Sequence, residues 1–147
     1  MRKSIRNISL AFLIIFFTII NLKFAFGDVC PPETSYADCV ATLNGLPDMG
    51  QASPQEVAAH FDMLNQEKRA QLSSEQLSEV IAQKSPSTLG DLSQYNPVAL
   101  AQALQSQGYD VSRLGGNIAG ARFEGNTLVI GNSHFDAKTG KPFFSDN

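Results

Sequence analysis

The sequence predicts an α+β fold, a small irregular helical bundle followed by a short C-terminal β-meander. Two observations predict it. Between residues 28 and 114, helix-start signals recur about every twenty residues, and apolar residues at helical spacing follow each of them. After Gly115-Gly116 the pattern changes to short apolar runs separated by Gly and Asn, which is typical of strands joined by tight turns.

The first 27 residues have the layout of a secretory signal peptide. A basic segment at residues 2–6 precedes an apolar run of about fifteen residues, and AFG at 25–27 places small residues at the cleavage positions. We therefore expect cleavage after Gly27 and a secreted or periplasmic protein. The alternative is a signal anchor, but this run is short for a bilayer, which needs roughly 20 apolar residues.

Composition restricts the mature chain of 120 residues to one domain of ordinary size. Cleavage would remove four of the 11 Lys and Arg residues and none of the 14 Asp and Glu residues, which leaves a net charge of −7. We expect no nucleic-acid partner, because such a chain is not attracted to phosphate backbones. We also expect no membrane association after cleavage, because no second apolar run is long enough to span a bilayer.

The two cysteines, Cys30 and Cys39, lie in the segment CPPETSYADC. In an oxidising compartment, a pair this close predicts one disulfide that closes a small loop. A redox pair usually has the spacing Cys-x-x-Cys, which is absent. No histidine lies near the cysteines in the sequence, so a zinc site would lack half of its ligands.

Residues 28–114 are predicted to form a helical module. Ser53, followed by Pro54 and by Glu56 at the third helical position, forms a capping box. The apolar residues after it continue at i, i+4 and i+7 through Leu64, which predicts one long helix face. Ser73 and Asn96 are expected to begin two further helices, and a shorter helix is expected from Tyr36 to about Asn44.

Residues 115–147 are predicted to form a β-rich tail that packs on the helices. The expected strands are Arg122-Phe123, Thr127 to Ile130 and His134 to Asp136, with turns at residues 124–126 and 131–132. A further turn is expected at residues 138–141.

The same tail also divides into blocks of five residues: GNIAG, ARFEG, NTLVI and GNSHF. Ile118, Phe123 and Leu128 recur every fifth residue, and small residues stand two positions before each. Residues 116–130 thereby resemble the pentapeptide-repeat family, although the third and fourth blocks depart from its pattern. The resemblance implies the start of a β-solenoid as the alternative to the meander. Phe123 is central in both.

The sequence contains two histidines, and these are the main candidates for catalytic or metal-binding residues. His134 and Asp136 alternate on the same side of an expected strand, so they form a candidate hydrolase or metal site. A triad would need a serine, and no Gly-x-Ser-x-Gly elbow is present. His60 is expected in the middle of a helix, at the boundary of its apolar face. No glycine-rich phosphate loop or other cofactor motif is found.

Two tripeptides near the C-terminus, KTG at 138–140 and SDN at 145–147, match motifs of penicillin-binding proteins and serine β-lactamases. The nucleophile motif Ser-x-x-Lys is absent, and the two tripeptides stand in the reverse of the family order. We therefore interpret residues 138–140 as a turn.

The sequence thus favours an exported, non-catalytic protein that acts through contacts with an envelope or extracellular protein. One alternative is a small secreted hydrolase or metal-dependent enzyme that uses His134 and Asp136. Another is the N-terminal part of a longer surface protein.

Overall fold

The computed structural model describes residue 30 and residues 34–115 and 118–143. The expected signal peptide and its cleavage position lie outside the described residues. So do residues 144–147, which include the SDN tripeptide.

Five helices pack together and are followed by a three-stranded antiparallel sheet, which confirms the α+β prediction. Short 3-10 helices connect several of the α-helices. In chain order the elements are α2 (Tyr36–Gly45), η1 (Met49–Gln51), α3 (Pro54–His60), η2 (Phe61–Met63), α4 (Gln66–Ala70), α5 (Ser74–Gln83), η3 (Pro86–Leu89), η4 (Leu92–Gln94), α6 (Pro97–Ser106), β1 (Ala121–Glu124), β2 (Thr127–Ile130) and β3 (Ser133–Asp136).

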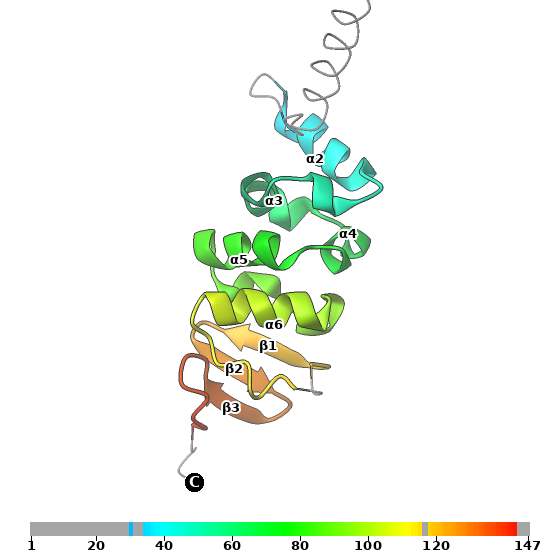
Figure 1. The fold of residues 1–147 in the computed structure, drawn as a ribbon. Helices are drawn as coiled ribbons and strands as arrows, with labels where there is room; N and C mark the ends of the chain where they lie inside the picture. Colours follow the sequence, from blue (N-terminus) through cyan, green and yellow to red (C-terminus); the bar gives the residue numbers. More distant parts are fainter. Residues whose placement is uncertain (1–29, 31–33, 116–117, 144–147) are drawn as a thin grey trace, which may run out of the picture.

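The elements form successive layers (Figure 1), with α2 and α3 at one end and the sheet at the other. Helix α5 packs between α3 and α6, and β1 packs against η3 and η4. One hydrophobic core runs through the layers. It includes Leu43 of α2, Phe61 of η2, Leu100 of α6 and Phe123 of β1. The ends of the molecule are thus far apart but joined by continuous packing.

The helix starts lie at the predicted capping residues. Ser53 and Ser73 each form a complete capping box, with Glu56 and Gln76 respectively, and the Asn96 side chain caps α6. Each cap satisfies N–H groups that the first helical turn leaves without a partner. These short-range contacts explain why the starts are predictable from the sequence.

The helix expected from Ser53 through Leu64 is wrong in its last four residues. Helix α3 ends at His60, the chain continues as η2, and a separate helix α4 begins after Asn65. The Asn65 side chain accepts a hydrogen bond from the Lys68 N–H at 2.9 Å. Arg69 donates to the carbonyl oxygens of Phe61, Asp62 and Leu64, which stabilises the break in the helix.

Gln76, which is 2% exposed, is a polar side chain in the interior of the helical layers whose amide groups have hydrogen-bond partners. Its Nε2 donates to the carbonyls of Met49 and Ala52 at 2.6 and 2.8 Å. Its Oε1 accepts from the Ser73 N–H at 2.9 Å. The capping glutamine of α5 therefore also fixes the segment around η1.

The C-terminal sheet is an antiparallel meander in the order β1-β2-β3, so the meander forms and the β-solenoid alternative does not. The two turns have two residues each and begin with Gly125 and Gly131, both at φ 60°. This positive φ at the first turn position suits the type II′ hairpin, whose twist matches the strands. Phe123 lies directly opposite Leu128, and both are buried on the core side of the sheet.

Candidate functional site

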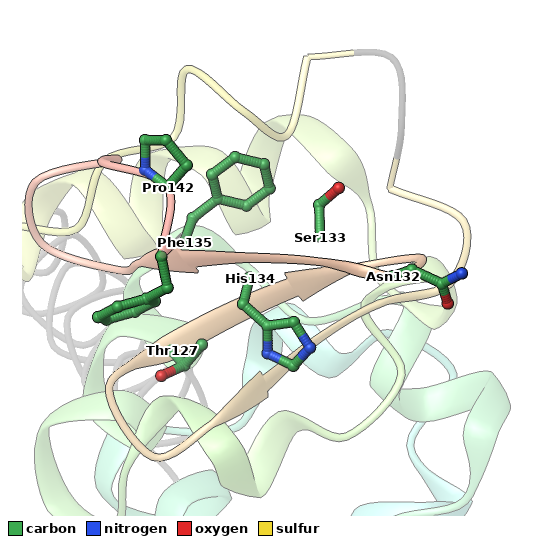
Figure 2. A pocket seen from close by; sticks show the side chains of 7 residues that line it. Thr127, Asn132, Ser133, His134, Phe135 and Pro142 are labelled. Atoms are coloured by element: carbon green, nitrogen blue, oxygen red, sulfur yellow. The ribbon is translucent and has the colours of Figure 1, made fainter. Parts of the chain in front are cut away.

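The predicted candidates His134 and Asp136 lie on β3, the strand farthest from the helices in chain order and in the sheet. His134 pairs with Val129, and Asp136 pairs with Thr127. Figure 2 shows the His134 and Thr127 side chains on one side of the strands and the Phe135 and Ser133 side chains on the other. Strand alternation therefore places His134 on the face of the sheet opposite to the core.

Asp136 is committed to a turn. Its Oδ1 accepts hydrogen bonds from the N–H groups of Lys138 and Thr139 and from the Thr139 hydroxyl, at 2.7 to 3.1 Å. The Thr139 hydroxyl and N–H stabilise the ionised carboxylate and lower the pKa of Asp136. Among the described residues, no hydrogen bond joins Asp136 to His134. The carboxylate is therefore positioned to hold residues 136–140 together, and not to orient the imidazole.

The KTG tripeptide also has a structural position. Lys138 Nζ donates to the Gln107 carbonyl at 2.7 Å, just after the C-terminal end of α6, and lies 3.6 Å from the centre of the Tyr109 ring. Gly140 has φ 65°, and a Cβ there would overlap the Asp110 carboxylate. These contacts attach the turn to the end of the helical layers. Residues 137–139 form a turn, close to the position expected from the sequence.

An open depression lies around β3 and the segment that follows it. Its lining includes His134, Phe135, Pro142 and Phe143. The Phe143 N–H donates to the His134 carbonyl at 2.8 Å, so residues 142–143 run alongside β3. The lining side chains come from both sides of the strand (Figure 2). They form a surface with aromatic character and not a set of groups that converge on one point.

The opposite end of the molecule holds a different cluster. Cys30 and Cys39 form the predicted disulfide. His60, the last residue of α3, offers a ring nitrogen that lies with both sulfur atoms inside a group of ligand atoms no more than 4.8 Å apart. No histidine lies near the cysteines along the chain, but the fold places His60 close to both of them.

The surroundings of His60 leave one of its nitrogens available. Its Nδ1 is buried and has no hydrogen-bond partner among the residues that the structure describes. The Tyr36 ring lies 4.7 Å from the imidazole, centre to centre, and tilts over it at 59°. Tyr36 stands on α2 one turn before Cys39, so one helix supplies both a sulfur and the aromatic neighbour of the histidine.

The position of Cys30 depends on more than its disulfide. Its N–H donates to Oε1 of Glu56 at 3.0 Å, and the other carboxylate oxygen of Glu56 closes the capping box with Ser53. Glu56 and His60 are four residues apart on α3, hence on the same helix face. The N-terminal residue of the cluster is thereby attached to the helix that carries the histidine.

The sequence gives no direct signal for this cluster. The 20 residues between Cys39 and His60 belong to the rest of α2, to η1, to most of α3 and to the segments that join them. The fold brings the end of α3 back to α2 at this point, so that His60 lies beside Tyr36 and both sulfurs. The one indirect signal is the capping glutamate Glu56, because its carboxylate fixes the start of α3 and also accepts from Cys30.

Comparison with protein-family models, curated proteins and solved structures finds no match. Within residues 30, 34–115 and 118–143, no helix has the length and hydrophobicity to cross a bilayer. The functional conclusion therefore rests on the geometry of the sheet end and of the disulfide end of the molecule.

Proposed function

We propose that this protein is exported and acts, without catalysis, through contacts with another protein in the periplasm or outside the cell. The signal-peptide pattern of residues 1–27 supports export. The Cys30–Cys39 disulfide agrees with it, because structural disulfides persist in oxidising compartments.

The observation that carries the proposed mode of action is the aromatic surface at the sheet end, formed by His134, Phe135, Pro142 and Phe143. Phe143 is 54% exposed, and Phe135 is half-buried beside it. Exposed aromatic side chains are favoured in the centres of protein interfaces, where they bury a large apolar area at low entropic cost. A partner with an apolar side chain that fits against Phe143 would suit this surface.

The hydrolase and metal-enzyme alternatives at His134 and Asp136 have weaker support. A catalytic histidine needs an orienting group, and a metal needs at least three converging ligands. Asp136 already accepts three hydrogen bonds within its own turn, and His134 is exposed on a strand. The contact surface includes His134 and requires no such convergence of ligands or catalytic groups.

Export is tested by N-terminal sequencing of the protein recovered outside the cytoplasm of an exporting host. The sequence should begin at Asp28. An intact N-terminus in the membrane fraction would indicate a signal anchor and would contradict the proposal.

The contact is tested by placing a photo-cross-linking amino acid at Phe143 or, as a control, at Val98, which is 64% exposed on α6. Irradiation of the exporting host should give a discrete protein adduct from position 143 and none from position 98. A second arm combines the label at position 142 with Phe143→Ser, which should remove the adduct. Equal labelling from 143 and 98, or an adduct that survives Phe143→Ser, would contradict a specific contact at this surface.

A further inference from the structure

We infer that Cys30, Cys39 and His60 form a redox-switched site for zinc, closed by the disulfide and opened when that bond is reduced. The inference is independent of the proposed protein contact, because it concerns the other end of the molecule. It rests on the position of the three side chains and on the unpartnered Nδ1 of His60.

The donor set suits zinc. Two thiolates and an imidazole are typical zinc ligands, and tetrahedral bonds of about 2.0–2.3 Å place neighbouring ligand atoms roughly 3.5–3.8 Å apart. The ligand atoms of Cys30, Cys39 and His60 already lie within 4.8 Å of one another. Reduction lets the sulfurs separate, so a small side-chain rotation completes three of four positions. Water would take the fourth.

The framework around the cluster does not depend on the disulfide alone. Cys39 is 2% exposed and lies on α2 with the buried Leu43, while α3 buries Val57 and Ala58 in the same core. Cys30 is attached to α3 through the hydrogen bond from its N–H to Glu56. We therefore expect all three ligands to stay near one another when the S–S bond is broken.

The chemistry of the switch is a thiol–disulfide exchange followed by metal binding. A dithiol reductant gives two electrons and two protons to the Cys30–Cys39 bond and becomes a disulfide, and both cysteines become thiols. Zn²⁺ then forms two Zn–S bonds and one Zn–N bond. The two thiol protons leave to solvent, and the neutral imidazole binds through its lone pair without losing a proton. In the reverse direction, a disulfide-bearing oxidant takes two electrons from the thiolates and two protons from solvent and becomes a dithiol, the Cys30–Cys39 bond forms again, and Zn²⁺ leaves to solvent.

The test measures zinc binding to the protein as recovered from the exporting host, either oxidised or reduced with a phosphine. A phosphine is preferred because a dithiol would itself bind zinc. Equilibrium dialysis against Zn²⁺ should give about one zinc per reduced chain and no stoichiometric zinc on the oxidised chain. Co²⁺ in place of Zn²⁺ should give the sulfur-to-metal absorption of thiolate ligation in the reduced chain alone.

The two histidines supply matched variants. His60→Ala should weaken zinc binding by the reduced chain roughly 100-fold or more, since it removes a direct ligand, whereas His134→Ala should leave it unchanged. His60→Gln should behave like His60→Ala while it preserves side-chain size, and the melting temperature of each oxidised variant reports whether it folds.

Equal zinc binding by the oxidised and reduced chains would overturn the inference. So would full zinc affinity in a folded His60→Gln variant, or equal losses in His60→Ala and His134→Ala.

Discussion

The two histidines lie at opposite ends of the molecule. The sequence favours His134 as a site residue, but the structure places potential metal ligands around His60. His134 has a carboxylate two residues away, yet that carboxylate is engaged by Lys138 and Thr139. His60 also has a carboxylate two residues away, that of Asp62, but this carboxylate pairs with Lys84. The His60 imidazole lies instead beside both sulfurs, with a buried nitrogen that no described group engages. Proximity in the sequence is thus a poor guide to reactivity where turns use the polar side chains.

The two ends of the molecule are also held together by different kinds of contact. Within the sheet end, local contacts join the strands, namely two tight hairpins and a turn around Asp136, and Lys138 attaches that turn to the Gln107 carbonyl. The disulfide end is built from contacts between elements far apart in the sequence, such as Cys30 with Glu56 and Tyr36 with His60. Substitutions at the two ends should therefore affect different properties.

The largest expected effect on stability is at Phe123, which joins the sheet to the helices. Its side chain is 6% exposed, faces Leu128 and meets the Tyr109 ring edge-on at 5.8 Å between centres. Phe123→Ala should lower the free energy of unfolding by about 3–5 kcal/mol, because it leaves a cavity in the core. Urea denaturation measures this loss.

His134→Ala is the matched control on the same sheet. An exposed position away from caps and cores usually changes the free energy of unfolding by no more than about 0.5 kcal/mol. If the two variants ranked in the opposite order, the sheet would not be anchored through Phe123, and the description of the sheet end as structural would be wrong.

The next effect in size is the disulfide. The double variant Cys30→Ala, Cys39→Ala should lower the free energy of unfolding by about 2–3 kcal/mol, as the loop-entropy relation gives for so short a loop. Thiol titration of the unfolded, unreduced wild-type chain should find no free thiol. Two titratable thiols would show that the pair is not oxidised in the native compartment.

A comparable loss is expected at Gln76, between the two ends. Gln76→Leu removes the donor to the Met49 and Ala52 carbonyls and also the N-terminal acceptor of α5. Leaving buried carbonyls unpaired should cost about 1–3 kcal/mol. Gln83→Leu, the same change at the exposed last residue of the same helix, is the control, and thermal unfolding of both variants at equal concentration checks the difference. Equal melting temperatures would contradict the bridging role of Gln76.

The smallest effect is the pH response of Asp136. Because its hydrogen bonds lower its pKa in the folded state, its ionised form stabilises the fold above the ordinary aspartate pKa of about 4. That stabilisation disappears as the pH falls through the lower folded pKa. Asp136→Asn keeps an acceptor oxygen but no charge, so its stability difference from wild type should shrink between about pH 5 and pH 2.

Melting temperatures of both proteins across this range measure the effect. Asp91 and Asp110, whose pKa values are also lowered by serine hydrogen bonds, are present in both chains and cancel in the comparison. A difference that stays constant with pH would show that the Asp136 charge does not stabilise the turn.

Much of the fold is predictable because its signals are local. Ser53, Ser73 and Asn96 bond to N–H groups two or three residues away, and Gly125 and Gly131 supply the φ that their turns require. The break after His60 is not predictable in this way, since the apolar spacing through Leu64 also fits one helix. It depends on Arg69, whose guanidinium reaches back to the carbonyls of Phe61 and Leu64.

In the candidate sites, too, contacts between residues close in the chain are predictable, and contacts that depend on the fold are not. The disulfide is predictable because its cysteines are close in the chain. The third member, His60, is not, because it meets Tyr36 and the two sulfurs only after the chain has folded. His134 and Asp136 share one side of a strand as predicted, but the hydrogen bonds from Lys138 and Thr139 become visible only once the turn is in place.

The contrast between the two histidines is tested most directly by nuclear magnetic resonance of their ring nitrogens in the phosphine-reduced protein. Long-range proton–nitrogen spectra would be recorded during titration with Zn²⁺. We expect a ring nitrogen of His60 to shift to a metal-bound position at about one equivalent of Zn²⁺, while the His134 nitrogens stay in place. Shifts at His134 with an unchanged His60, or equal shifts at both, would contradict this expectation.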